Sequence, residues 1–201
     1  MPSTIRSQIR PAIVLTLALC VITGLVYPGV VTGLAQLFFP RQANGSFVTV
    51  DGRTVGSALI GQSFTNPEYF HSRPSAAGAG YDATASGGTN KGPTDSVLAA
   101  HIAARVDQVH RSHGAIGPVP SDMVTSSGSG LDPDISPGNA LLQVPRVARA
   151  RGASAAAIRT LVEQHIEGRQ FGIFGEPRVN VLELNLELDR RFPHATVAGP
   201  R

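Results

Sequence analysis

The chain has 201 residues, enough for one ordinary domain or for a smaller domain attached to a membrane segment. Lysine and arginine number 17 against 14 acidic residues, and without Arg6 and Arg10 the balance is 15 to 14. This near-neutral remainder excludes the basic patch that nucleic-acid binding requires, so we expect no nucleic-acid partner. A single cysteine, Cys20, excludes a disulfide framework.

An uncharged run of thirty residues separates Arg10 from Arg41. About 20 helical residues cross a bilayer core, and the run has no convincing signal-peptide cleavage site, so it predicts a retained transmembrane helix over residues 11–39. Pro28 removes one backbone hydrogen bond and predicts a kink. The residues that favour close packing of this helix in the membrane are Gly24, Pro28, Gly29 and Gly33.

The basic residues beside this helix predict its orientation. Arg6 and Arg10 precede it and Arg41 alone follows it, so the positive-inside rule makes residues 1–10 cytoplasmic. Residues 42–192 then form a periplasmic or extracellular domain, and residues 193–201 a flexible tail. We therefore expect a single-pass protein of the cell inner (plasma) membrane.

The first part of the exported domain predicts a small sheet and a long loop. Asp51–Gly52 lies between two β-rich runs and is typical of a two-residue hairpin turn, and residues 57–64 are expected to extend the sheet. Residues 66–92 are rich in Gly, Pro, Ser and Ala. Their length favours a functional or partner-ordered loop, with plain disorder as the alternative.

Four helices are predicted after this loop. Pro93 begins the first and Gly114 ends it; Ser136–Pro137 begins the second, which Pro145 should bend or split before Gly152. Ser154 caps the third, which ends at Gly168. Residues 181–189 alternate like a strand, but Asn180 and Glu183 fit a capping box, which favours a helix. The predicted fold class is mixed α/β (α+β): one transmembrane helix, then one domain with a small sheet and about four helices.

The stretch Val124–Pro137 matches neither the catalytic nor the phosphate-binding motif that its serines and glycines suggest. The serines lack the glycine spacing of a nucleophile elbow, and the only lysine, Lys91, does not fit a phosphate-binding loop. Asp132 and Asp134 flank Pro133, with no basic or metal-binding partner nearby in the sequence. Turn and cap chemistry explains the stretch better than catalysis does.

Three other groups of residues could form a binding site, but a purely structural role explains each of them as well. Residues 86–93 could form an anion-binding nest, but a helix lead-in held against a partner is the simpler interpretation. Arg146, Arg149 and Arg151 resemble a phosphate clamp, although a solvated helix face accounts for them. His110 and His113 share a helix face without a third ligand, so we expect surface imidazoles and no metal site.

Ordered motifs over nearly the whole chain carry a family resemblance. They include G-L-V-Y-P-G-V-V-T-G-L-A-Q, Y-F-H-S-R-P-S-A, S-G-G-T-N-K-G-P, Q-V-P-R-V-A-R-A-R-G and G-E-P-R-V-N-V-L-E-L-N-L-E-L-D. The sequence resembles the C subunit of the bacterial Kdp-type potassium-transporting ATPase. Asp134, Thr89 and Lys91 depart from the residues expected in this family.

The resemblance implies an accessory, non-catalytic subunit. Its implied partners are a potassium-channel-like subunit, a P-type ATPase subunit and a small membrane subunit. It implies that the complex handles ATP and potassium and that this chain stably binds no cofactor. The family is described as a catalytic chaperone that raises the nucleotide affinity of the ATP-hydrolysing subunit, and Gln143 matches the glutamine tied to that role.

The predicted orientation conflicts with direct contact between Gln143 and cytosolic ATP. We therefore expect indirect coupling through the geometry of the complex, with the exported domain capping the potassium entrance. The residues assigned to partner-interface or scaffold loops are Ser86, Gly87, Gly88, Asn90, Gly128, Ser129, Gly130, Asp132, Pro133, Ser136 and Arg146.

Two other classes remain open on the sequence alone. A membrane-tethered hydrolase would use Ser127 or Ser129 and has poor support. A membrane-tethered extracytoplasmic binding module would take a small ligand unaided.

Overall fold

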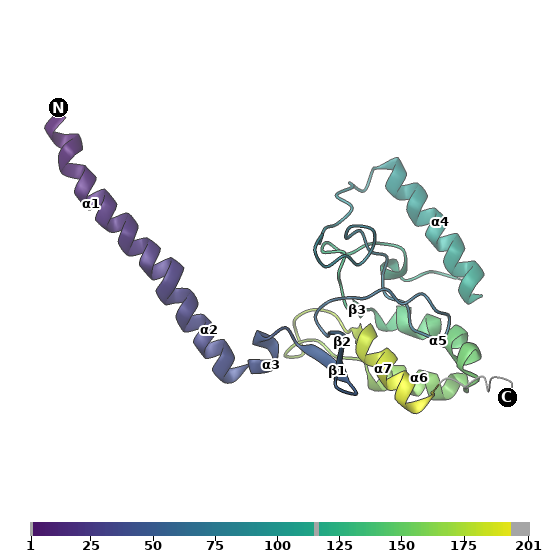
Figure 1. Ribbon diagram of the computed structural model, residues 1–201. Helices are drawn as coiled ribbons and strands as arrows, with labels where there is room; N and C mark the ends of the chain where they lie inside the picture. The colour runs from purple at the N-terminus through teal and green to yellow at the C-terminus, as the bar shows by residue number, and fades with distance from the viewer. Residues whose placement is uncertain (1, 115–116, 194–201) are drawn as a thin grey trace, which may run out of the picture. The chain divides into compact units, whose positions relative to one another are not determined.

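The computed structural model describes residues 2–114 and 117–193, which fall into two compact units (Figure 1). Met1–Phe47 is the first unit and Val48–Arg201 the second. The first unit is almost entirely helical, whereas the second mixes helices with two small sheets. This arrangement confirms the predicted mixed α/β class. Apart from Pro193, the predicted tail 193–201 lies outside the described residues.

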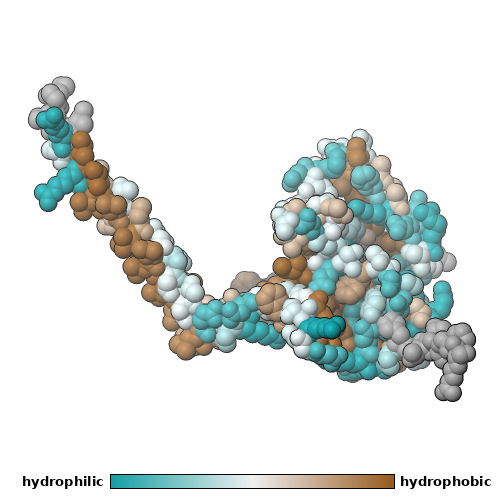
Figure 2. Space-filling view, viewed as in Figure 1, coloured by the Kyte–Doolittle hydropathy of each residue, from teal (hydrophilic) through white to brown (hydrophobic). Residues whose placement is uncertain are grey.

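The first unit contains the helix expected from the uncharged run. The segment Arg6–Phe38 is long and apolar enough to cross a membrane, and Figure 2 shows apolar side chains along its length. The helix begins well before residue 11, because no residue in the preceding turns breaks it. Its parts are α1 (Pro2–Val21), a π-helical segment (Ile22–Val26) and α2 (Tyr27–Phe38), followed by the short α3 (Pro40–Ala43).

Pro28 changes the hydrogen bonding of this helix locally. A proline has no N–H to donate and its ring crowds the carbonyl one turn earlier. The wider turns of the π-helical segment Ile22–Val26 directly precede α2, where proline occupies the first turn. The predicted disturbance therefore takes the form of a π-helical segment within a continuous helical run.

The predicted hairpin is confirmed. Strands β1 (Phe47–Val50) and β2 (Arg53–Ser57) form a two-stranded sheet, and Asp51 and Gly52 both have positive φ, 50° and 77°. The predicted extension over residues 57–64 is wrong, because the Ser57 hydroxyl accepts a hydrogen bond from the Leu59 amide and turns the chain away.

A second sheet was not predicted. Strands β3 (Asp134–Ile135) and β4 (Val179–Asn180) pair antiparallel, with Asp134 opposite Asn180 and Ile135 opposite Val179. Each strand has two residues, too few for an alternating pattern to appear in the sequence. The pairing joins the starts of two helices that lie far apart along the chain.

Four helices of eight or more residues lie in the described part of the second unit. They are α4 (Ser96–His113), α5 (Pro137–Arg151), α6 (Ala155–Gln164) and α7 (Val181–Arg191). A short polar side chain caps each N-terminus by accepting an amide hydrogen bond; the caps are Asp95, Ser136, Ser154 and Asn180. The helix predicted over residues 181–189 is thereby confirmed.

Two predicted helix boundaries were wrong, and the predicted split of a helix at Pro145 does not occur. The cap Asp95 makes α4 begin at Ser96 rather than at Pro93. The helix α5 runs unbroken through Pro145, because buried residues on both sides of the proline belong to one stripe that packs on α6. The helix α6 ends at Gln164 rather than near Gly168, and the His165 ring hydrogen-bonds the Leu161 carbonyl there.

The core joins α5, α6, α7, the β3–β4 sheet and one residue from the long irregular segment. Its fully buried members on the helices include Val147, Leu161 and Leu184. Phe70 is 0% exposed, although residues 58–95 contain no helix or strand. Burial of this aromatic ring fixes the middle of the irregular segment against the helices.

The backbone of Phe70 is satisfied by a side chain from α7. The Phe70 N–H donates to Asn185 Oδ1 at 2.8 Å, and Asn185 Nδ2 donates to the Phe70 carbonyl at 2.9 Å. Asn185 is itself buried. The amide thus occupies the place of a neighbouring strand and removes the cost of burying two backbone polar groups.

Replacing Asn185 with leucine keeps the branched shape of the side chain and leaves both Phe70 backbone groups buried without partners. We expect a loss of about 2–6 kcal/mol in the free energy of unfolding, because each of the two orphaned groups costs about 1–3 kcal/mol. Urea unfolding of the full chain in detergent, followed by circular dichroism, measures this loss. The exposed Gln170→Ala change is the control, and an equal effect of both variants would contradict the role of Asn185.

Candidate functional site: an arginine-lined cleft

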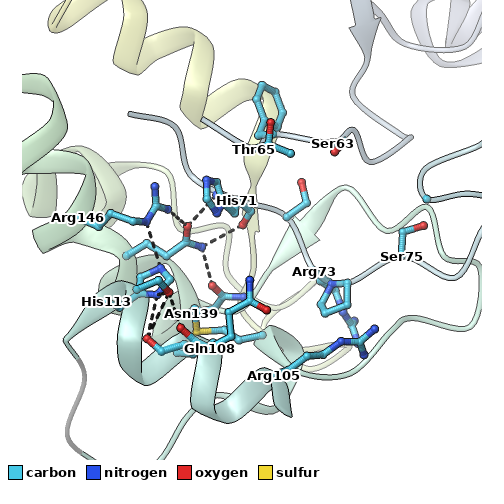
Figure 3. A pocket seen from close by; sticks show the side chains of 18 of the residues that line it. Ser63, Thr65, His71, Arg73, Ser75, Arg105, Gln108, His113, Asn139 and Arg146 are labelled. Atoms are coloured by element: carbon cyan, nitrogen blue, oxygen red, sulfur yellow. Dashed lines mark hydrogen bonds between the residues drawn. The ribbon is translucent and has the colours of Figure 1, made fainter. Parts of the chain in front are cut away.

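A cleft of about 550 Å³ opens between the irregular segment, α4 and α5 (Figure 3). The irregular segment contributes His71 and Arg73, and α4 contributes Arg105 and His113. Three residues of α5, one helical turn apart, form another part of the lining: Asn139, Gln143 and Arg146. Gln143 and Arg146, both assigned from the sequence, therefore meet at this site.

Gln143 is a buried structural contact within the cleft wall. Its Oε1 accepts from the His71 N–H at 2.7 Å, and its Nε2 donates to the His71 carbonyl at 3.0 Å. Oε1 also accepts from the Arg146 guanidinium, and Nε2 donates to Asn139 Oδ1. The residue is 1% exposed, so its hydrogen-bonding capacity is used internally.

Gln143 and Asn185 act on consecutive residues. Asn185 holds the backbone of Phe70, and Gln143 holds that of His71 in the same manner. We call this pair of side chains the amide clamp. It fastens one irregular dipeptide to two helices, α5 and α7.

A polar network continues from Gln143 to the start of α5. Asn139 Nδ2 donates to the Asp122 carboxylate at 2.9 Å, and the same carboxylate accepts from the Ser136 N–H at 2.7 Å. The Ser136 hydroxyl caps α5 and also donates to Asp122. The predicted cap is therefore also the end of a network that leads to the cleft.

Arg146 joins all three walls of the cleft. Its guanidinium donates to the carbonyls of Pro67 and Tyr69, to Gln143 Oε1 and to His113 Nε2. Each of these acceptors is neutral, and no carboxylate in the described part of the chain pairs with it. Burial lowers the pKa of Arg146 to about 10, which still leaves it charged at neutral pH.

The two histidines of the cleft are neutral. His113 Nε2 accepts from Arg146 Nε at 3.2 Å, which requires the unprotonated ring. Burial, and then the Arg146 charge, lower the pKa of His113 to about 4, and the same two causes lower the pKa of His71. The expectation of a surface imidazole is wrong for His113, because α4 turns it toward α5.

Two of the predicted scaffold loops contact each other. The Gly87 N–H and the Ser86 hydroxyl both donate to the Ser129 carbonyl, at 2.8 and 3.0 Å. Gly130 has a φ of 67°, and a Cβ there would lie 2.6 Å from the Ala77 nitrogen and the Gly87 oxygen. Only glycine permits this close approach.

Other scaffold residues have separate roles. Gly88 packs on the backbone of Gly128, where an added Cβ would lie 3.1 Å from the Gly128 oxygen. Asn90 is exposed and has a φ of 53°. The Pro133 carbonyl accepts from the Val181 N–H at 3.0 Å and joins the second sheet to α7.

The two aspartates of the stretch Val124–Pro137, Asp132 and Asp134, do have basic partners. Arg73 pairs with Asp132 at 2.8 Å, and Arg178 pairs with Asp134 at 3.1 Å. Both partners come from distant parts of the sequence, which explains why the neighbouring residues gave no sign of them. Ion pairs with two distant arginines therefore hold the stretch Val124–Pro137 in place.

Arg151 is not part of a solvated helix face. Its side chain is 0% exposed; it pairs with Asp189 at 2.7 Å and stacks over the Tyr69 ring at 4.8 Å. Arg149 is exposed, as expected. Arg146 and Arg151 therefore hold the irregular segment, and the predicted solvated face is wrong for these two residues.

The structure gives the candidate serines local partners. The Ser127 hydroxyl accepts from the Gly130 N–H, and the Ser129 hydroxyl accepts from the Leu131 N–H. Neither is hydrogen-bonded to a histidine or a carboxylate within residues 2–114 and 117–193. The same residues contain no group of three or more potential metal ligands.

The four predicted packing residues lie in the first unit. Gly24 is in the π-helical segment and Gly29 and Gly33 are in α2, where an added Cβ would meet no other atom within 4 Å. Pro28 lies in the first turn of α2. Their role in packing against other membrane helices stays a prediction.

Gln143 was assigned by resemblance alone, and five other residues of the cleft and of the network around it were missed in the sequence: Arg73, Arg105, Asp122, Asn139 and Asn185. Asn139 and Gln143 share the buried stripe of α5 with Ala140 and Val147, and Asn185 lies beside Leu184 and Leu188 on α7. Amide side chains within an apolar helix stripe could have indicated these contacts, because a buried amide needs a polar partner. Arg73, Arg105 and Asp122 gave no comparable signal.

A family model described as K+-transporting ATPase, c chain (KdpC), matches residues 9–190. The chain belongs to this family. The family match thus includes the cleft, both members of the amide clamp and most of the apolar helix.

Curated relatives agree with this assignment. The potassium-transporting ATPase KdpC subunit of Gemmatimonas aurantiaca is 67% identical over 90% of this chain and 92% of its own. The subunit of the same name from Koribacter versatilis is 51% identical over 95% and 98%. That of Myxococcus xanthus is 54% identical over 98% and 93%.

The neutral state of His113 predicts a pH dependence of stability. Its pKa lies below the ordinary value of 6.5, so the unfolded chain binds more protons as the pH falls. The contribution of neutral His113 to the free energy of unfolding is complete above about pH 6.5 and is lost progressively toward about pH 4. Thermal unfolding of the full chain against pH, compared with His113→Gln, measures it.

His71 is present in both the unmodified protein and the His113→Gln variant, and its lowered pKa affects stability in the same direction. The difference between the two pH profiles therefore reports His113 alone. We expect a shallower loss of stability on acidification in the variant. Parallel pH profiles for the two proteins would show that His113 does not titrate with folding.

Proposed function

We propose that the chain is the accessory C subunit of a potassium-transporting ATPase and carries no transport chemistry itself. The family assignment and the names of the relatives support this proposal. The partners are a potassium-channel-like subunit, a P-type ATPase subunit and a small membrane subunit. The apolar helix anchors the chain in the cell membrane, with residues 1–10 cytoplasmic and the second unit outside.

The role in nucleotide affinity is proposed to be indirect. The geometry of Gln143 supports this, because its amide is buried and bonded to His71, Asn139 and Arg146. Contact with a nucleotide would require breaking the clamp. Gln143 therefore acts by fixing the irregular segment, whose position sets how the domain fits its partners and shifts their conformational equilibrium.

An exposed apolar turn supports an assembly role for the second unit. Phe171, Ile173 and Phe174 are 85%, 70% and 63% exposed. The turn is held in shape by the Gln170–Phe174 bridge and by an ion pair between Arg169 and Glu176 at 2.8 Å. An exposed apolar turn whose flanking charges are paired suits an apolar pocket of a partner subunit.

Removing the two aromatic rings tests the assembly role. The change Phe171→Ser with Phe174→Ser should weaken assembly at least about tenfold, because each ring loses about 1.5–3 kcal/mol of burial. Co-purification of the partner subunits in detergent measures this. The matched control Val97→Ser removes another exposed apolar side chain, from α4. Unchanged co-purification in the double variant would exclude this turn from the interface.

Two clamp variants test indirect coupling. If Gln143 acts through the irregular segment, then Gln143→Ala and Asn185→Ala should both raise the ATP concentration for half-maximal hydrolysis by the assembled complex. Direct contact with nucleotide would make Gln143→Ala alone effective.

The orientation of the chain in the membrane is measured by labelling single cysteines, placed at Ser7 or at the exposed Ala150 in a Cys20→Ser background. Protection of position 150 from an external, impermeant maleimide would overturn the proposed topology.

A membrane-tethered binding module is the second candidate, and the cleft favours it. A solvent-open cleft with converging polar side chains is typical of a ligand site.

A further inference from the structure

The charge on the cleft lining is one-sided. Of the described residues that line it, three are arginines and none is aspartate or glutamate, while its two histidines are neutral. Basic and acidic residues are nearly equal in number across the rest of the chain. The cleft therefore concentrates positive charge in a domain that has almost no net charge.

Arg146 supplies charge to the cleft rather than free donors. Its guanidinium nitrogens are occupied by two backbone carbonyls, Gln143 and His113. None of these acceptors is negative, so the field of the guanidinium persists into the cleft. An anion entering beside it would gain Coulomb energy without displacing an existing ion pair.

Arg73 supplies a donor that the protein leaves without an acceptor. Its Nη1 pairs with Asp132 at 2.8 Å. Its Nε is buried and has no hydrogen-bond partner among the described residues. A buried N–H without an acceptor is unfavourable, so a shift of the Arg73 side chain that exposes Nε to a ligand oxygen would remove that penalty.

Arg105 approaches the same cleft from α4 (Figure 3). One of its nitrogens, Nη1, donates to the Val124 carbonyl at 3.0 Å, which orients the side chain. No carboxylate in the described part of the chain pairs with it. Arg105 therefore retains guanidinium N–H groups for a ligand.

We propose that this cleft binds an oxyanion, a carboxylate or phosphate group, through Arg73 and Arg105, with Arg146 providing a fixed positive charge. The planar donor fork of arginine matches groups with two oxygens on one centre. A volume of about 550 Å³ admits a small organic anion or one acidic side chain. The inference does not rest on the proposed function, because binding is measured on this chain alone.

Titration of the purified full chain in detergent with inorganic phosphate tests the site. We expect saturable binding at one site that weakens with added chloride. Arg105→Gln should weaken it at least about tenfold, the cost of one charge-assisted hydrogen bond. The control Arg111→Gln removes the same charge from an exposed position on α4 outside the cleft, and should leave affinity within about twofold.

Two further measurements separate the possible outcomes. In the unmodified protein, phosphate should shift the side-chain resonances of Arg73 and Arg105 in nitrogen-15 spectra, which keeps the test valid if a variant misfolds. Sodium succinate serves as the carboxylate probe. No saturable binding of either anion, or equal weakening by Arg105→Gln and Arg111→Gln, would overturn the proposal.

The source of the anion is read from the assembled complex. Phosphate binding by the isolated chain and by the complex would assign the site to a free ion. Binding by the isolated chain that disappears in the complex would assign it to a carboxylate of a partner subunit. Both results support the oxyanion site.

Discussion

The second unit depends on two buried amide side chains that take the place of a neighbouring strand. Asn185 and Gln143 each satisfy both backbone groups of one residue, Phe70 and His71. Without them, burial of this dipeptide would leave four polar groups without partners, at about 1–3 kcal/mol each. The clamp therefore makes it possible for an irregular segment to contribute Phe70 to the core.

The cleft follows from the clamp. Once His71 is fixed to α5, Arg73 lies on the same segment two residues later, and Arg146 can reach the carbonyls of Pro67 and Tyr69. The bond from Arg146 to His113 then connects α5 to α4. These hydrogen bonds therefore connect the core, the cleft and α4.

Local signals in the sequence were sufficient for local structure. The Asp51–Gly52 turn, the caps at Ser136, Ser154 and Asn180, and the apolar run before Arg41 each depend on neighbouring residues, and the structure contains each of them. Asn180 resolved the ambiguous leucine pattern in favour of a helix because its side chain accepts the Glu183 amide.

The site could not be predicted in the same way, because its contacts join residues far apart along the chain. Gln143 was assigned by resemblance alone, and its bonds to His71 span 72 residues. Asp132 and Arg73 are separated by 59 residues, so the sequence around Asp132 gave no sign of a basic partner. The irregular segment had no periodic pattern to place it, and its position became clear only from the amides that hold it.

Amide hydrogen exchange at Phe70 and His71 in the full chain tests the central claim most directly. If the clamp holds this dipeptide, both amides should exchange as slowly as those of the buried part of α5, although neither belongs to a helix or strand. Exchange at the rate of an exposed loop would contradict the account.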